Sequence, residues 1–141
     1  MRQVVCLADR PWSAIPTRTQ QLMTRMKGAE VLYFEPSRRQ DSNGWKSPGR
    51  KLRPDLIAYT LPPTGGLLAR RDASRALRFL QSTLEHHGFR EPLLWCASPG
   101  GARFLDDFAY RGLVYDCARD WPKYPESWES EVTSSADVCF A

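Results

Sequence analysis

Short runs of apolar and β-branched residues alternate along the chain with stretches of helical periodicity. The apolar runs are short enough for strands buried on both faces and lie at 4–8, 31–34, 56–60, 92–97, 113–116 and 137–141. Helical spacing of apolar residues follows Pro16, fills 70–87, and resumes after Ser98 and Pro125. This order predicts an α/β fold, with a doubly wound, mostly parallel, Rossmann-like sheet of about six strands in one domain over 1–141.

The predicted helix ends carry recognisable signals. Thr17 and Gln20 form a capping box, in which each side chain is expected to bond a first-turn amide, and Gly28 is expected to end that helix. Residues 86–88, His-His-Gly, place basic side chains and a glycine cap at the end of the 70–87 helix, so both histidines are interpreted as structural. Between the second and third strands, 37–54 is polar and is predicted to be a loop.

Composition excludes several classes of protein. The 141 residues are 42% hydrophobic and 26% charged, as in an ordinary globular domain, which excludes wholesale disorder. No apolar run approaches the ~20 residues of a membrane-spanning helix, and the first is too short for a signal peptide, so we expect a cytoplasmic protein. The four cysteines form no CxxC pair, which predicts reduced thiols and no metal site.

Charge is distributed unevenly along the chain. Residues 1–90 hold 16 Lys and Arg against 7 Asp and Glu, whereas 91–141 hold 4 against 9. Arg71, Arg75 and Arg78 share the polar face of the 70–87 helix, where they are either a solvated face or a contact for an anionic surface such as the inner membrane leaflet.

Candidate site residues follow the predicted strands, because ligands of doubly wound sheets bind beyond the carboxyl ends of the strands. Asp116, with Asp120 four residues later, has the placement of a general base or a hydroxyl-orienting pair, although a turn and a helix-start charge explain both equally well. The other candidates are types that bind sugars and phosphates: Asp9, Trp12, Arg18, Glu35 and Trp121 for substrate, and Ser98, Gly100 and Gly101 for phosphate at a predicted helix start.

Familiar nucleotide and hydrolase motifs are absent. No GxGxxG or P-loop follows any predicted strand, which disfavours the usual modes of NAD, FAD and ATP binding. No GxSxG elbow occurs either, which disfavours an α/β-hydrolase.

A series of short motifs spans nearly all of the chain. They are Trp12, Pro-Thr-Arg-Thr-Gln-Gln-Leu at 16–22, Val-Leu-Tyr-Phe-Glu-Pro at 31–36, Leu-Trp-Cys at 94–96 before Pro99, Val-Tyr-Asp-Cys at 114–117 with Asp-Trp at 120–121, and Ser-Ala-Asp-Val at 135–138. Together they resemble the N-terminal half of bacterial glycosyltransferases with the two-domain GT-B fold. Ala118 and Arg119 depart from the Val-Asp of that pattern, which removes one carboxylate.

The resemblance implies a transferase that moves a sugar from a nucleotide-sugar donor to a cell-surface glycan or lipid-linked acceptor. It implies that Arg18 faces the cleft, that Asp116 and Asp120 lie near the acceptor, and that 98–101 lie near the donor phosphates. It also implies no metal or other cofactor, the nucleotide sugar being a substrate. The C-terminal, donor-binding half is expected to be missing, so the chain alone is expected to be inactive.

Two other readings remain open. A free-standing Rossmann-like binding or regulatory domain would have the same strand order, without catalysis. A nucleic-acid binder would explain the basic first part, but no helix-turn-helix, RRM or zinc motif accompanies that charge, so no nucleic-acid partner is expected.

Overall fold

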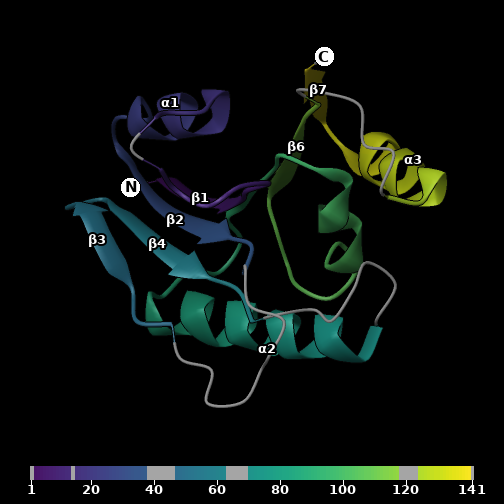
Figure 1. Ribbon diagram of the computed structural model, residues 1–141, viewed down its shortest axis with the longest axis horizontal. Coiled ribbons are helices and arrows are strands. Elements are labelled where there is room, and N and C mark those ends of the chain that lie inside the picture. Colours follow the sequence, from purple (N-terminus) through teal and green to yellow (C-terminus); the bar gives the residue numbers. More distant parts are fainter. Residues whose placement is uncertain (1, 14, 38–46, 63–69, 118–123, 141) are drawn as a thin grey trace.

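The computed structural model describes residues 2–13, 15–37, 47–62, 70–117 and 124–140, with the backbone alone for 70–73 (Figure 1). Seven strands form one sheet in this part of the chain: β1 (Arg2–Leu7), β2 (Ala29–Glu35), β3 (Arg50–Arg53), β4 (Leu56–Thr60), β5 (Leu93–Cys96), β6 (Gly112–Asp116) and β7 (Val138–Phe140). The helices are α1 (Arg18–Thr24), α2 (Arg70–His86), the 3₁₀ helix η1 (Pro99–Arg103) and α3 (Glu126–Ser135).

The strand order is β3-β4-β2-β1-β5-β6-β7, and β3 is antiparallel to β4 while every other pairing is parallel. The chain adds β2 and then β4 on one side of β1, and afterwards returns to the other side to add β5, β6 and β7. The order therefore reverses between β1 and β5, which is where doubly wound sheets bind ligands. The predicted α/β, mostly parallel fold is confirmed.

Helices cover both faces of this sheet (Figure 1). On one face, α1 buries Met23 against alternate residues of the strands, among them Cys6 and Tyr33. On the other face, α2 packs Ala76, Leu80 and Leu84 over the remaining residues, and η1 and α3 complete that layer. Successive strand residues point to opposite faces, so near-continuous apolar strands bury both sides, as the sequence predicts.

One strand was not predicted. The expected loop at 37–54 ends in β3, an edge strand whose residues are mostly exposed and basic, while 38–46 lie outside the described residues. Pro54 and Asp55 make the tight connection to β4. Because an edge strand needs pairing on one side only and tolerates charged residues, it lacks the apolar pattern by which buried strands are recognised.

The predictions for two helices are corrected in three respects. The first helix ends at Thr24, and Gly28, with φ +75°, lies in the following turn. Thr17 Oγ1 accepts from the Gln20 amide, which is half of a capping box, but the Gln20 side chain bonds Ser13 instead of completing it. The helix expected after Ser98 is only the five-residue η1.

The second helix ends as predicted, with Gly88 at φ +71° forming its cap. Arg75 and Arg78 are exposed, and the side chain of Arg71 lies outside the described residues. None of the helices in the described ranges has both the length and the apolar character needed to cross a bilayer.

Candidate functional site

The carboxyl ends of β1, β5 and β6 form one rim of the sheet, and most of the predicted site residues lie there. Asp9 follows β1, Ser98 follows β5, and Asp116 ends β6. Arg18 opens α1, which begins above this rim after the β1–α1 loop. Residues that the sequence separates by nearly one hundred positions are therefore neighbours at the reversal of strand order.

Arg18 and Asp116 form an ion pair across this rim. Arg18 Nη2 lies 3.0 Å from Asp116 Oδ1, and the Asp116 side chain is 1% exposed while that of Arg18 is 49% exposed. Among the described residues, no donor has the alignment of a hydrogen bond to either Asp116 oxygen. Arg18 therefore covers a buried carboxylate whose acceptor capacity is largely unused.

Burial and two neighbouring charges shift the pKa of this carboxylate. Removal from water raises the pKa of Asp116, the nearby Arg18 guanidinium lowers it, and the Asp9 carboxylate raises it again, with a net upward shift. A carboxylate of raised pKa that lacks hydrogen-bond donors accepts a proton or a hydroxyl hydrogen more readily than a surface aspartate does. The role of Asp116 as a base or hydroxyl acceptor stays a prediction, which the raised pKa favours.

The loop between β1 and α1 is fixed by hydrogen bonds from several directions. Tyr33 Oη donates to the Arg10 carbonyl at 3.0 Å, and the Trp12 amide donates to Glu35 Oε2 at 2.6 Å. The Ser13 amide donates to Gln20 Oε1 at 2.9 Å, and Gln20 Nε2 donates back to the Ser13 carbonyl at 3.0 Å. The Trp12 ring packs edge-on against Tyr33, with 5.0 Å between ring centroids. The loop thus holds Trp12 in a defined position before any ligand arrives.

Glu35 has a different environment from the one expected of a substrate ligand. Besides Trp12, its carboxylate accepts from Arg50 Nη2 at 2.6 Å and from Thr60 Oγ1 at 2.8 Å, and its side chain is 5% exposed. Arg50 and Thr60 come from β3 and β4, so Glu35 joins three strands to the β1–α1 loop. Sequence reasoning missed both partners, because Thr60 is brought opposite Glu35 by the pairing of β4 with β2, and Arg50 is brought there by the antiparallel pairing of β3 with β4.

The 98–101 turn is compact and buried. Ser98 Oγ accepts from the Gly100 amide at 3.2 Å, and the Ser98 carbonyl accepts from the Gly101 amide at 3.4 Å, so the turn itself engages both amides. A Cβ at Gly101 would lie 2.4 Å from Cys96 Sγ, which explains why glycine is required there. Gly101 therefore has a packing role that the sequence alone did not distinguish from anion binding.

Arg103 is a cation beside this turn that sequence reasoning did not single out. Its Nε donates to the Gly100 carbonyl at 3.0 Å, and its guanidinium lies 5.2 Å from the Phe104 ring centroid and 5.8 Å from that of Trp128. Burial lowers the pKa of Arg103, and Tyr124 opposes that shift. An arginine held between two aromatic rings supplies fixed positive charge at the end of β5.

Two buried thiols near this rim, Cys6 and Cys96, are not activated as nucleophiles. Burial raises the pKa of Cys96 to about 12 and that of Cys6 well above its usual range, so both are protonated at neutral pH. All four cysteines are free, as the sequence predicts; the apolar runs that contain them also suggest small core residues, which holds for Cys6 and Cys96 but not for the exposed Cys139. Within the described ranges, no group of three or more His, Cys, Asp or Glu residues could hold a metal ion. Asp120 and Trp121 lie outside the described residues.

Comparison with solved structures identifies the fold. Trehalose-6-phosphate synthase from E. coli, solved with UDP-2-fluoro glucose, matches with a TM-score of 0.61 and 11% identity over 97% of this chain and 39% of that chain. Sucrose-phosphate synthase from Thermosynechococcus elongatus matches with a TM-score of 0.62 and 13% identity over 99% of this chain and 42% of that chain. Both are GT-B glycosyltransferases. This chain has the fold of a GT-B glycosyltransferase domain.

The fold expected from the resemblance is thereby confirmed. The chain spans about two fifths of the length of these two glycosyltransferases. No protein-family model matches the sequence, and no curated protein matches it.

Proposed function

We propose that this chain is the acceptor-side half of a glycosyltransferase that uses a nucleotide sugar. The observation that carries the proposal is the buried Asp116 carboxylate under the Arg18 guanidinium, 3.0 Å away, at the point where strand order reverses in a GT-B fold. A second half of the enzyme would provide the opposite wall of the cleft and most of the nucleotide contacts. The length of the two similar glycosyltransferases, more than twice that of this chain, supports such a partner.

In this proposal the rim binds the acceptor, a glycan or a lipid-linked sugar. The Trp12 ring offers an apolar plane for a pyranose face, and Asp9 offers a carboxylate for its hydroxyls. Arg18 moves aside or bonds the acceptor, so that Asp116 accepts the hydrogen of the attacking hydroxyl, with Asp120 and Trp121 contributing from the following segment. Glu35 acts as a positioning residue that holds the Trp12 amide.

The donor phosphates would approach the 98–101 turn. The Gly100 amide already donates to Ser98 Oγ and is not free to bind an anion. The phosphates would therefore accept a hydrogen bond from the Ser98 hydroxyl and pair with the Arg103 guanidinium. The donor is a substrate, so the proposal needs no metal or other cofactor.

Binding of acceptor sugars to the chain tests the proposal. A panel of mono- and oligosaccharides is titrated while amide chemical shifts are followed. Ligands of the site are expected to shift the 9–18 and 116–117 amides, with Trp12→Ala and Asp116→Asn each weakening binding at least about tenfold. Arg111→Met, an exposed change elsewhere, is the matched control. Absence of saturable binding by every sugar, or unchanged binding in both variants, contradicts the acceptor-side assignment.

Turnover separates the half-enzyme part of the proposal from the binding part. We expect no sugar transfer from any nucleotide sugar by the chain alone. Transfer by the chain alone would show that it is not half of an active site.

The exposed Arg75 and Arg78 on α2 suggest that the enzyme rests on an anionic membrane surface at the inner leaflet, where its lipid-linked acceptor would lie. Each such residue contributes about 1 kcal/mol at an anionic surface. Sedimentation with vesicles tests this point, since equal binding to neutral and anionic vesicles would contradict it.

A further inference from the structure

A pocket lies at the amino ends of β2 and β4, at the end of the sheet opposite the candidate site. Its volume is about 590 Å³, within the ~300–1,000 Å³ of small-molecule sites. It is lined by the start of β2, the β3–β4 connection and the residue that follows α2: Glu30, Val31, Leu32, Arg53, Pro54, Asp55, Ile57 and His87. Neither the fold comparison nor the proposed transfer reaction assigns any role to these residues.

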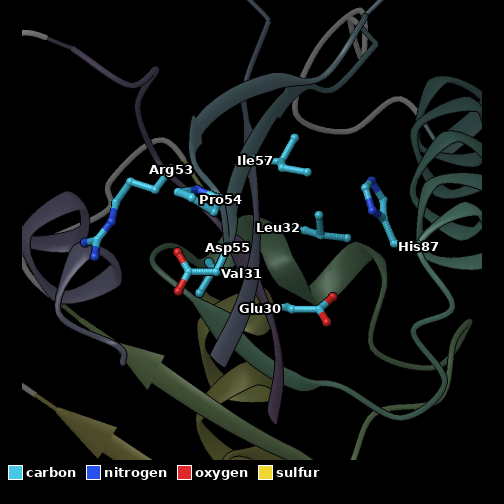
Figure 2. A pocket seen from close by; sticks show the side chains of 8 residues that line it. All are labelled: Glu30, Val31, Leu32, Arg53, Pro54, Asp55, Ile57 and His87. Atoms are coloured by element: carbon cyan, nitrogen blue, oxygen red, sulfur yellow. The ribbon is translucent and has the colours of Figure 1, made fainter. Parts of the chain in front are cut away.

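The strands divide this lining into two flanks (Figure 2). On the α2 side, Leu32 and Ile57 form an apolar floor, with Glu30 at one end and His87 facing the floor across the space. On the α1 side lie Val31, Asp55 and Arg53, and the Arg53 guanidinium is engaged by the Thr24 carbonyl of α1. The α2 flank therefore combines an apolar floor with one carboxylate and one imidazole.

The imidazole on this flank is held in place and kept neutral. His87 Nε2 lies 2.7 Å from Tyr59 Oη, and Tyr59 is packed between Phe34 and Phe79. Burial lowers the pKa of His87, the neighbouring His86 lowers it further, and Glu30 opposes the shift. Burial also raises the pKa of Tyr59, so its hydroxyl remains protonated.

Glu30 is the group on this flank whose charge is not satisfied. Its carboxylate is half-buried, and among the described residues it takes part in no hydrogen bond or ion pair. Glu30 and His87 influence each other only through the electrostatic effect of their proximity, since no ion pair joins the two side chains. A carboxylate accepts hydrogen bonds and cannot donate them, so its complement is a cation or a donor.

We infer that this pocket binds a small organic ammonium ion with an apolar body. The ammonium group pairs with the Glu30 carboxylate, and the body lies on Leu32 and Ile57 against the His87 ring. The Arg53 guanidinium is tied to α1 and does not neutralise Glu30. Because the pocket is at the opposite end of the sheet from Asp116, ligand binding here is independent of the proposed sugar site.

The test uses the whole chain with 2-phenylethylamine, a protonated amine at neutral pH, and 2-phenylethanol, its neutral counterpart. Chemical-shift titration of backbone amides gives both the dissociation constant and the location. We expect the amine to shift amides at 30–32, 57 and 87, and to bind about tenfold more tightly than the alcohol. Glu30→Gln should abolish that difference, and Glu91→Gln, an exposed carboxylate outside the pocket, should leave it intact.

Lowering the pH provides a second readout that needs no variant. When the pH is lowered far enough for His87 to gain a proton, the new positive charge beside Glu30 should weaken amine binding but not alcohol binding. Shifts elsewhere on the surface, equal affinity for the two probes, no saturable binding of the amine, or an amine preference that survives Glu30→Gln would each overturn the inference.

Discussion

Replacing Arg18 with methionine removes the only cation found within ion-pair distance of the Asp116 carboxylate among the described residues. Methionine keeps the length of the aliphatic stem and its packing at the start of α1, so the change is mainly electrostatic. The buried carboxylate then loses its partner while keeping the Asp9 charge that raises its pKa. We expect the variant to be less stable, by an amount that depends on pH.

The magnitude follows from the 3.0 Å separation of Arg18 Nη2 and Asp116 Oδ1. Two unit charges at that distance attract by about 1.4 kcal/mol in water and about 5.5 kcal/mol at an effective dielectric constant of 20. Because the Arg18 side chain is 49% exposed and no aligned hydrogen bond from the described part of the chain supplements the pair, the lower part of that range applies. We expect a loss of about 2 kcal/mol at pH 8, roughly a thirtyfold change in the folding equilibrium.

The sign of the pH dependence follows from the raised pKa. A carboxyl group whose pKa is higher in the folded state stabilises the fold below its ordinary value of 3.8, and that contribution is lost as pH rises through the folded-state value. Removing Arg18 raises the pKa of Asp116 further. The difference in stability between the two proteins should therefore be small near pH 4 and widen toward pH 8.

Urea unfolding followed by tryptophan fluorescence, at intervals from pH 4 to pH 8, measures this difference. The same Arg18→Met change in an Asp116→Asn background should cost less than about 0.5 kcal/mol at every pH, because uncoupled surface changes usually fall within that range. Arg111→Met is the matched control. An Arg18→Met cost that is equal in both backgrounds, or independent of pH, would refute the electrostatic coupling.

Three further predictions follow from local geometry. Gly101→Ala should destabilise the fold by roughly 1–3 kcal/mol in urea unfolding, since the new Cβ meets Cys96 Sγ at 2.4 Å. Gly112→Ala, whose Cβ would have contacts of 3.4 Å, is the control and should cost less. Equal costs for the two variants would contradict the packing role of Gly101. Glu35→Gln should speed proteolysis of the β1–α1 loop by loosening its hold on the Trp12 amide, and an unchanged cleavage rate would argue against that role. Because the pKa of His87 is lowered from 6.5, its contribution to stability should be present above pH 6.5 and decline below it, and His87→Phe should flatten that part of the urea-measured profile.

The candidate site was predictable in part, because strand ends are readable from sequence. A run such as 113–116 locates the end of a strand, and in a parallel sheet all such ends fall on one edge, so Asp9, Ser98 and Asp116 could be grouped without coordinates. The role of Glu35 could not be predicted. Its partner Thr60 lies opposite it because β4 pairs with β2, and Arg50 reaches it only because β3 pairs antiparallel with β4; that edge strand has no distinctive pattern.

The sequence by itself determined the alternation of strands and helices. Strands buried on both faces need continuous apolar runs, and helices packed on a sheet need apolar residues at a period of about 3.6 residues, and both patterns are local properties of the chain. The tertiary structure decided which charges meet: that Arg18 covers Asp116, that Gly101 serves packing against Cys96, and that Glu30 faces a pocket with His87. These facts depend on distances of a few ångströms between residues far apart in the chain. Interaction energies and pKa values change steeply over such distances, and spacing along a sequence does not encode them.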